Sequence, residues 1–508
     1  GNPDHPANAG ALCSRGQQGI LATYSPDRFV GPMVAGASVE WDKALEATVS
    51  AVKATKAAGK QVAWLGQSRT GATGALITAF MKAVDSAPLF WEPTSGVDAL
   101  RGATRKMFGL NTIPTFELAS AHTIVSFGAE FLSTWGGIPL RKGWADSRDP
   151  AKGGFVSRTV CIEPRIGNTS AMADVHLACE PGSESAVALT IASIVKARKA
   201  GQTQAARDVG GLKAAQIEKV VGWLMEGPSV VLPGGVHTSA NPSQLAEMVL
   251  AVNHVLGNIG KTVTFGQTAN VADYCSHKDV ESLIAACKDG KVGVLFLDGA
   301  DPVYALPPGL AAEAALAGVQ LVAFSNEPND TLNAKAIVLP SGTTLETWGD
   351  AEATVHWHTL QQATMMPLQN TRQMGDVLLQ IAKASGVVPV PVVAETVEAV
   401  ESEGDAAAST EGEAVVAAAP VAAPLPLLDS ADFSTWLKGW WEAVVFPKSG
   451  SAGSFSDFWV ASLKRGGFFV NVPRTGAPVK DFSPGVPPAA VQGSGDYYFM
   501  VFPHPFIH

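Results

Sequence analysis

The chain has few cysteines and no closely spaced pair of them. Five cysteines occur among its 508 residues, and none of them forms a C-x-x-C pair. They are Cys13, Cys161, Cys179, Cys275 and Cys287. A zinc site or an iron–sulfur cluster needs several ligands close together. A self-contained centre of either kind is therefore not expected, and free, buried thiols are.

Positive charge and long apolar segments are also scarce. Lys and Arg total 36 against 46 Asp and Glu, and the net charge is -10. Phosphate backbones are bound by clustered basic residues, so a nucleic-acid partner is not expected. No uninterrupted apolar run reaches the roughly 18 residues that cross a bilayer. Any contact with a membrane would therefore come through partner subunits.

Short, almost continuous apolar runs are what the sequence does contain. They lie at 62–65, 123–127, 160–162, 230–232, 292–297, 321–324 and 336–339. Continuous runs indicate strands buried on both faces, as in a parallel sheet covered by helices. Helical patterns alternate with them at 43–58, 185–197, 212–225 and 242–256. This alternation predicts the α/β class with two doubly wound parallel-sheet lobes.

Composition along the chain sets the expected domain boundaries. No Lys or Arg occurs between Lys383 and Lys438, where Ala, Val, Pro and Glu dominate. Such a stretch buries little apolar surface and predicts a long acidic linker. The expected division is an N-terminal segment at 1–42, a first α/β lobe at 43–210, a second α/β lobe with a return segment at 211–386, the linker at 387–432, and a Trp-rich C-terminal segment at 433–508.

The Trp-rich segment contains three tryptophans at helical spacing, Trp436, Trp440 and Trp441. Such a stripe is more often a packed face than a ligand site. Aromatic side chains are enriched at protein interfaces, so we expect this face to dock on a neighbouring subunit.

Several motifs together resemble one known family. Cys161-Ile-Glu-Pro-Arg165 is followed by ADVHLACEPGSESAVALTIAS, and later come GADPVYALPPG, AKAIVLP, LETWGD and LQQATMMPLQNTRQMGDVLLQIA. In this order the pieces resemble the large α/β body of molybdopterin oxidoreductases. Members of that family hold a bis-pterin-guanine cofactor between two doubly wound sheets. The resemblance covers nearly the whole chain apart from the linker.

The resemblance implies a nucleotide-binding region at the acidic-Pro-Arg motif. In the family, the acid and nearby backbone hold the guanine end of a pterin nucleotide, and a carboxylate is chemically suited to accept hydrogen bonds from guanine. If such a nucleotide is retained, the candidate residues are Glu163, Arg165, Ser183 and Glu184. The structural alternative is that Glu184 caps the helix that begins near Ser185, while Glu163 pairs with Arg165.

The family's metal-binding positions are poorly matched. In its enzymes a Cys, selenocysteine or Ser after the second strand ligates molybdenum or tungsten, yet no cysteine lies between Cys13 and Cys161. Ser95 or Thr94 is either a replacement ligand or an ordinary helix cap, and we favour the cap. Cys13 matches the last ligand of the family's iron–sulfur cluster, with Arg15 two positions on. Its three partner ligands would have to lie upstream, so we expect Cys13 to be a structural remnant.

Three weaker signals remain. A strand, a glycine-rich turn and a helix start follow one another at 61–74, and amides at such a turn can hold phosphate oxygens. Glycine also serves these turns for steric reasons alone. His356 and His358 would share one face of a strand, which suggests a metal pair, but without a third ligand we expect a surface strand. By analogy with the family, Asp301 lines the cofactor.

The closest likeness within the family is the molybdopterin-like domain of the large iron–sulfur subunit of alternative complex III, a quinol-oxidising complex of respiratory or photosynthetic chains. GNPDHP, IPTFELASAHTIVSFGAEFLSTW and FPHPFIH favour it. The resemblance implies a non-catalytic scaffold without its own cofactor, with [4Fe–4S] and [3Fe–4S] clusters in a region beyond His508. The implied partners are integral-membrane quinol-binding subunits, c-type cytochrome subunits and that iron–sulfur region, at the periplasmic face of the membrane.

Two other functions stay open. One is a catalytic molybdenum or tungsten oxidoreductase of the polysulfide or thiosulfate reductase type, which holds a bis-pterin guanine dinucleotide and needs an intact metal ligand. The other is an α/β protein that binds an ordinary nucleotide and is a stable monomer without membrane partners.

Overall fold

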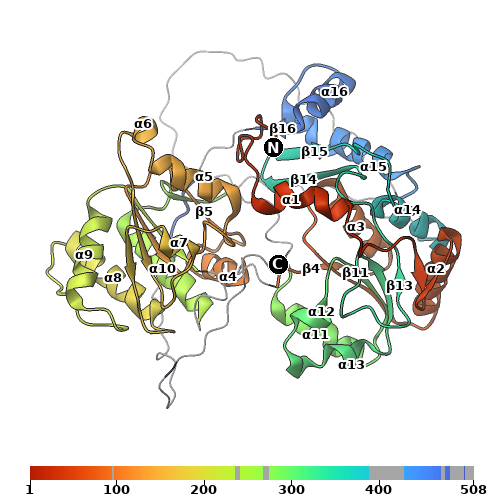
Figure 1. Cartoon of the computed structure of the whole chain (residues 1–508), viewed down its shortest axis with the longest axis horizontal. Coiled ribbons are helices and arrows are strands. Elements are labelled where there is room, and N and C mark those ends of the chain that lie inside the picture. Colours follow the sequence, from red (N-terminus) through yellow and green to blue (C-terminus); the bar gives the residue numbers. More distant parts are fainter. Residues whose placement is uncertain are drawn as a thin grey trace, which may run out of the picture.

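Two parallel sheets, each covered by helices, form two lobes that lie side by side (Figure 1). The computed structural model describes residues 1–93, 97–234, 241–266, 274–387, 428–470, 475–480 and 497. The predicted α/β class with two parallel-sheet lobes is confirmed. Most of the expected acidic linker, and the FPHPFIH end, lie outside the described residues.

One lobe contains a sheet with the strand order β2-β1-β13-β12-β11-β3-β4, and we call it the seven-stranded lobe. Its strands from β13 to β4 are parallel, whereas β1 and β2 form an antiparallel edge. The strands are β1 (Met33–Val34), β2 (Ala37–Ser38), β3 (Gln61–Gly66), β4 (Pro88–Phe90), β11 (Val292–Asp298), β12 (Gln320–Phe324) and β13 (Ile337–Val338).

Neighbouring residues along the central strands enter two different cores. Trp64 of β3 packs with α2 (Trp41–Ala57), α3 (Gly71–Ala83) and α14 (Met374–Ser385) on one face. Leu65, the next residue, packs with α11 (His277–Lys288) and α13 (Ala312–Leu316) on the other. Because side chains alternate across a strand, this double burial explains why the apolar runs are continuous.

The other sheet is fully parallel, with the order β8-β7-β6-β9, and we call its lobe the four-stranded lobe. Its helices α8, α9 and α10 lie close to their predicted positions. A two-stranded pair, β5 with β10, lies beside it. The elements are β5 (Thr115–Phe116), β6 (Thr123–Phe127), β7 (Arg158–Ile162), β8 (Val175–Leu177), β9 (Ser229–Pro233), β10 (Val263–Thr264), α4 (Val97–Phe108), α5 (Gly137–Ser147), α6 (Pro150–Gly153), α7 (Asn168–Ala171), α8 (Glu184–Lys199), α9 (Ala214–Met225) and α10 (Pro242–Leu256).

The lobes do not follow one another along the chain as the expected boundaries had it. The seven-stranded sheet draws its strands from 33–90 and 292–338, and the four-stranded sheet from 123–233. The expected boundary at 210/211 therefore falls inside the four-stranded lobe, where β9 pairs with β6. A buried apolar run indicates a strand but not its neighbour, because crossover connections decide which parallel strands meet.

The Trp-rich segment packs within the chain itself, and the expected docking on a neighbouring subunit is wrong for these side chains. It forms α15 (Phe433–Trp440), a π-helical turn (Trp441–Val445) and α16 (Phe455–Arg465). Trp436 and Trp441 are 2% and 0% exposed and belong to the core shared with α3 and α14. Helical spacing identified the apolar face, but spacing carries no information about what that face meets.

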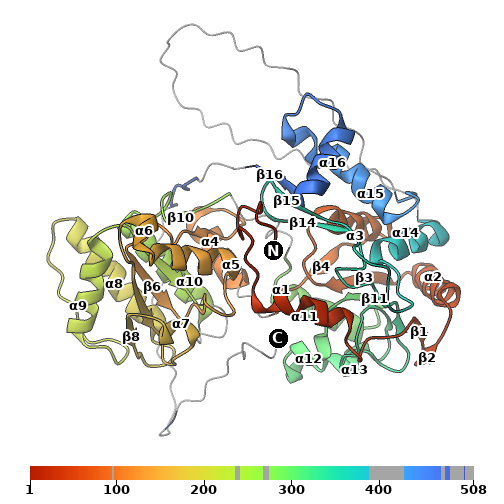
Figure 2. The ribbon, with the colours of Figure 1, turned by 45° about the horizontal axis from the view of Figure 1, so that its top comes forward.

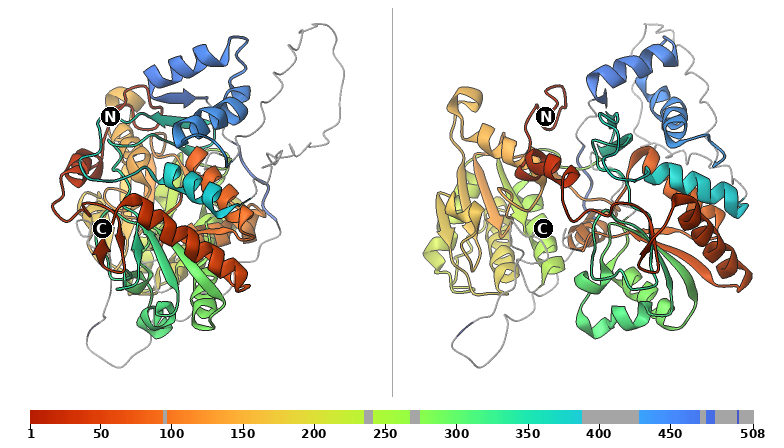
Figure 3. Two further views of the ribbon diagram at one scale, coloured as in Figure 1. Left: turned by 90° about the vertical axis from the view of Figure 1, so that its right-hand side faces the viewer. Right: turned by 45° about the vertical axis from the view of Figure 1, so that its right-hand side comes forward.

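A small antiparallel sheet of β14 (Gly349–Thr354), β15 (Trp357–Gln361) and β16 (Gly467–Phe469) lies between this segment and the seven-stranded lobe (Figure 2). Helix α1 (Ser14–Thr23) lies between the two lobes in Figure 2 and in the right-hand view of Figure 3. Within the described ranges we find no helix with the length and apolar character of a bilayer span.

A buried ion pair ties the N-terminal segment to the seven-stranded lobe. Arg28 Nη2 lies 2.8 Å from Glu346 Oε2, and the two side chains are 1% and 0% exposed. Leu368 N donates to Oε1 at 2.8 Å and Thr343 N to Oε2 at 2.6 Å. Burial opposes ionisation of Glu346, but the bonds from Arg28 and the two amides hold its pKa at about 2.

Replacing Glu346 with Gln should lower the free energy of unfolding by about 3–5 kcal/mol, because the Arg28 guanidinium stays buried without its counter-charge. Urea denaturation measures the loss. The matched control is Glu46→Gln, which breaks an exposed pair with Lys43 and should change little. Since the folded pKa lies below the ordinary 4.5, the pair stabilises above that pH and weakens as pH falls toward 2. Equal losses in both variants would contradict the assignment.

Candidate functional site

Both lobes place polar side chains beyond the carboxyl ends of their parallel strands, which is where open α/β sheets bind ligands. In the four-stranded lobe these side chains follow β6 and β7 and begin α8. In the seven-stranded lobe they follow β3, β11 and β12. The two groups of side chains differ in net charge. They also differ in whether side chains of the chain itself already occupy the ligand position.

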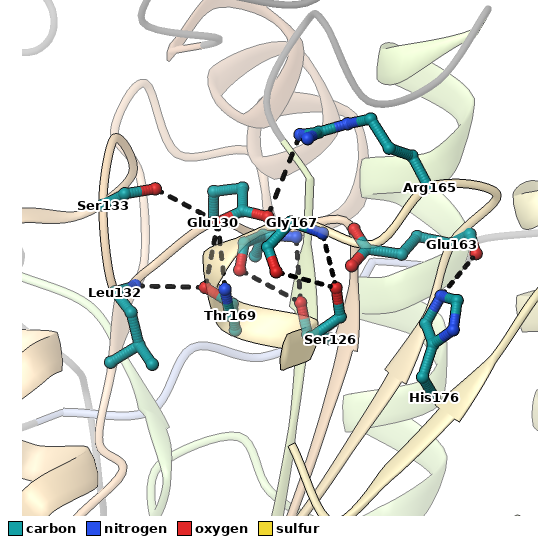
Figure 4. A network of polar contacts seen from close by, with 11 residues as sticks. Ser126, Glu130, Leu132, Ser133, Glu163, Arg165, Gly167, Thr169 and His176 are labelled. Atoms are coloured by element: carbon teal, nitrogen blue, oxygen red, sulfur yellow. Dashed lines mark hydrogen bonds and ion pairs between the residues drawn. The ribbon is translucent and has the colours of Figure 1, made fainter. Parts of the chain in front are cut away.

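Three buried carboxylates and one guanidinium lie together in the four-stranded lobe. Glu130 follows β6, Glu163 follows β7, and Glu184 begins α8; they are 7%, 6% and 1% exposed. Arg165 Nη2 lies 3.9 Å from Glu130 Oε1 (Figure 4). The predicted residues Glu163, Arg165, Ser183 and Glu184 thus come from neighbouring strand and helix ends, and their binding of a nucleotide stays a prediction.

Glu163 is the carboxylate best placed to meet a ligand. Its carbonyl oxygen lies 3.1 Å from His176 Nε2, which fixes the backbone at the end of β7 (Figure 4). Its Oε1 is buried and makes no hydrogen bond to the described residues. Burial raises the pKa of Glu163 to about 7, a bond from Ser170 opposes this, and the Glu130 charge adds to it. Near neutral pH this side chain therefore exists in both protonation states.

Two structural alternatives, Glu184 as a helix cap and Arg165 as the partner of Glu163, need correction. Helix α8 starts at Glu184 itself, so Glu184 is its first residue and not a cap. Ser183 stands at the cap position, but its hydroxyl donates to Glu180 O at 2.6 Å instead of accepting from the helix. A carboxylate in the first turn is stabilised by the helix dipole. Arg165 acts on Glu163 through its charge and forms an ion pair with Glu130.

Glu130 is a member of the cluster that the sequence prediction missed. Its Oε2 accepts hydrogen bonds from Thr169 N at 3.2 Å and Ser133 Oγ at 3.1 Å (Figure 4). The available signal was its position two residues after Gly128, which takes a positive φ of 72° at the end of β6. Acidic residues are common in loops, so position after a buried strand was the only indication.

Four of the five cysteines have raised thiol pKa values, which disfavours the thiolate form. All five are free, and three are buried, Cys161 in β7 among them. Burial raises the pKa of the Cys161 thiol, raises those of Cys179 and Cys275 to about 12, and raises that of Cys287 to about 11. Soft metals bind the thiolate form, which burial disfavours at these four positions.

Cys13 differs from the other cysteines because it stands at the N-terminus of α1. Its Sγ accepts a hydrogen bond from Gly16 N at 3.5 Å, and this bond lowers its pKa. The side chain thus has a structural role as a helix cap. Thr94 and Ser95, the alternative metal ligands, lie outside the described residues. No three His, Cys, Asp or Glu side chains are arranged to hold a metal ion in the part of the chain that the structure describes.

The two histidines do not form the pair on a surface strand that we expected. His356 lies in the turn before β15 with a φ of 65°, whereas His358 is inside β15 and 1% exposed. The rings of Trp440 and Trp441 lie 6.1 Å from the His358 ring, and burial lowers its pKa to about 3. Asp301 serves local structure, because its Oδ1 accepts from Tyr304 N at 3.3 Å at the start of α12 (Pro302–Ala305).

A cavity of about 490 Å³ lies at the carboxyl ends of β3, β11 and β12 in the seven-stranded lobe. Arg69 and Asp298 line it and form a two-bond pair at 2.7 Å each. Asn326 Oδ1 and Ser341 Oγ also belong to this lining and make no hydrogen bond to the described residues. The cavity is therefore polar but carries little free charge.

The glycine-rich turn that we considered for phosphate binding leads into α3 beside this cavity. Its first free amide, Ala72 N, donates to both carboxylate oxygens of Asp350 at 2.9 Å. Gly71 has a φ of 68°, and a Cβ there would lie 2.5 Å from Asp350 Oδ2. The space in front of the helix is thus filled by a carboxylate of the same chain.

A bis-pterin pair fits only part of this arrangement. The four-stranded lobe suits the donor edge of a guanine, since Glu163 Oε1 is a buried acceptor without a partner. The start of α3 does not suit a phosphate, because Asp350 already takes its amide. The described residues therefore do not fit the complete cofactor pair.

The fold is a two-lobed α/β body with a polar site at the strand ends of each lobe. The family model for molybdopterin oxidoreductases matches residues 28–384, and the chain belongs to this family. It is 24% identical over 431 residues to the menaquinone reductase molybdopterin-binding-like subunit of Nitratidesulfovibrio vulgaris, which covers 76% of this chain and 61% of that protein.

Two further comparisons agree with the family. The chain is 26% identical over 409 residues to the NADPH-Fe(3+) oxidoreductase subunit alpha of Geobacter sulfurreducens, covering 68% of this chain and 48% of that protein. Acetylene hydratase from Pelobacter acetylenicus has the same fold, with a TM-score of 0.59, 13% identity, and coverage of 75% and 65%. The chain thus spans 48% to 61% of the length of these two curated relatives.

Replacing Glu163 with Gln should change how stability depends on pH. The folded pKa of about 7 exceeds the ordinary 4.5, so the folded state holds the proton more tightly and the wild type loses stability as pH rises from 4.5 to 7. The variant should lose less over that window, as measured by urea denaturation at several pH values.

The control is Glu226→Gln in the same lobe, whose partner Arg158 and own side chain are both at least one-third exposed. It should follow the wild-type pH profile. If Glu163→Gln also follows that profile, Glu163 is ionised throughout and the buried-acid assignment is wrong.

Proposed function

We propose that this chain is the non-catalytic molybdopterin-like scaffold of a quinol-oxidising electron-transfer complex of the alternative complex III type. In this role it holds no metal cofactor and takes part in electron transport by positioning other subunits. Its partners are integral-membrane quinol-binding subunits, c-type cytochrome subunits and an iron–sulfur region with [4Fe–4S] and [3Fe–4S] clusters. The complex holds it at the membrane, on the periplasmic face.

The state of the cysteines carries the proposal. Four thiols are kept protonated by burial, and Cys13 Sγ is engaged by a helix amide. A molybdenum or tungsten ion in this family needs a protein ligand, and a soft thiolate is the best suited. The similarity to the menaquinone reductase molybdopterin-binding-like subunit of Nitratidesulfovibrio vulgaris supports the same role.

The alternative function is a catalytic molybdenum or tungsten bis-pterin oxidoreductase of the polysulfide or thiosulfate reductase type. One observation favours it, namely the buried acceptor Glu163 Oε1, which is suited to a guanine edge. The second nucleotide site argues against it, because Asp350 fills the start of α3.

Metal and pterin analysis of the purified native complex distinguishes the two functions. We expect molybdenum and tungsten far below one atom per chain, no fluorescent pterin after oxidative denaturation, and iron in proportion to the clusters of the partner region. A stoichiometric amount of either heavy metal together with pterin would sink the scaffold proposal. Iron serves as the internal control, because it shows that metal has survived purification.

A further inference from the structure

We propose that Asp350 is a built-in substitute for a phosphate group at the start of α3, and that it closes the seven-stranded lobe to phosphate-bearing ligands. The inference rests on the proposed scaffold function and explains how the lobe is stable without a nucleotide. It rests on three features of Asp350: its hydrogen bonds, its burial, and its fit against the glycine turn.

The hydrogen bonds of Asp350 are those that an anion makes at a helix start. The first turn of a helix has amides without partners inside the helix, and its dipole favours negative charge there. Ala72 N lies 2.9 Å from each Asp350 oxygen, and the Thr73 amide also donates to the carboxylate. The carboxylate therefore satisfies donors that a phosphate oxygen would otherwise take.

The C-terminal segment covers the carboxylate from its other side. Trp441 Nε1 donates to Asp350 Oδ2 at 3.1 Å, and Trp436 Nε1 donates to Ala72 O at 3.0 Å. Both indole rings are buried. A ligand would have to displace Asp350 from its bond with Trp441, at a helix start that Trp436 also contacts.

The backbone of the glycine turn lies directly against the Asp350 carboxylate, with no open space between them. Gly71 adopts a φ of 68°, and a Cβ at this position would approach Asp350 Oδ2 to 2.5 Å, closer than atoms of real side chains come. Asp350 itself lies in β14, and the backbone N of Glu352 in the same strand donates a hydrogen bond to Thr70 Oγ1 at 2.8 Å. Two residues of one strand thus hold the turn that precedes α3.

Removing the carboxylate should convert this position into an anion site. In Asp350→Ala, the amides of Ala72 and Thr73 lose their acceptor while the neighbouring cavity gives access from solvent. We expect inorganic phosphate to raise the melting temperature of this variant by about 2 °C or more at saturating concentration, since a ligand that binds only the folded state stabilises it. Differential scanning calorimetry in phosphate and in chloride of equal ionic strength measures the shift.

Three proteins serve as controls. The wild type should show no phosphate-specific shift, because its site is filled. Asp350→Asn keeps the volume of the side chain and should show none either, although it is destabilised. Asp432→Ala removes the cap of a solvent-exposed helix start, where Asp432 Oδ1 accepts from Thr435 N at 2.8 Å, and it tests whether any uncapped helix responds.

The outcomes separate clearly. A phosphate-specific shift in Asp350→Ala alone supports the proposal. An equal shift in the wild type, in Asp350→Asn or in Asp432→Ala overturns it, and so does the absence of a shift in every protein. If Asp350→Ala does not fold in chloride, its refolding yield is compared in phosphate and chloride, and a yield that phosphate does not raise overturns the proposal.

This test is independent of the test of the proposed function. Heavy metal and pterin in the native complex would contradict the scaffold function without changing the phosphate response of Asp350→Ala. Failure of the phosphate response would remove the role of Asp350 and leave the metal analysis unaffected.

Discussion

The hydrogen bonds of Asp350 hold the seven-stranded lobe together at the place where a ligand would otherwise complete it. One carboxylate joins β14 to the amide of Ala72 in α3 and to the indole of Trp441. Burial raises its pKa to about 7, against the bonds from Ala72 and Trp441 that favour its ionised form. Without an acceptor at this position, buried donors from two separate segments would stay unpaired, and each such group costs about 1–3 kcal/mol. The helix start, the small antiparallel sheet and the Trp-rich segment therefore depend on one side chain.

Much of the fold could be predicted because the strands are buried on both faces. Trp64 and Leu65 enter different cores, so the apolar run of β3 is continuous and stands out from its surroundings. The same property hides which strand lies next to it, since the central strands are all mostly apolar. The insertion of the four-stranded lobe between two parts of the seven-stranded sheet was therefore missed. Trp436 illustrates the same limit, because helical spacing revealed its apolar face but not that α3 would cover it.

The sequence predicted the site residues that lie together in one short motif. It missed the residues that only the tertiary fold brings to the site. Glu163 and Arg165 lie within one short motif after β7, and the structure places them in the cluster. Glu130 joins that cluster from another strand end, 33 positions before Glu163, and only the tertiary fold brings them together. Asp350 is 278 positions from Ala72. An acidic residue in a polar stretch is ordinarily a surface group, so no pattern in the sequence marks it as a buried anion.

The strand ends of the two lobes differ in how their buried polar groups are satisfied. In the four-stranded lobe the carboxylates Glu130, Glu163 and Glu184 outnumber the one guanidinium of Arg165, and a buried oxygen of Glu163 lacks a partner. Such a group is costly unless a proton or a ligand satisfies it. In the seven-stranded lobe the polar groups at the start of α3 find their partners within the chain. Asp350 accepts hydrogen bonds from Ala72 N and from Trp441 Nε1. The two strand-end sites therefore do not form the matched pair that a two-nucleotide cofactor requires. If the proposed function is correct, contacts between segments of the chain stabilise both lobes. The role of the chain is then to hold the partner subunits in position.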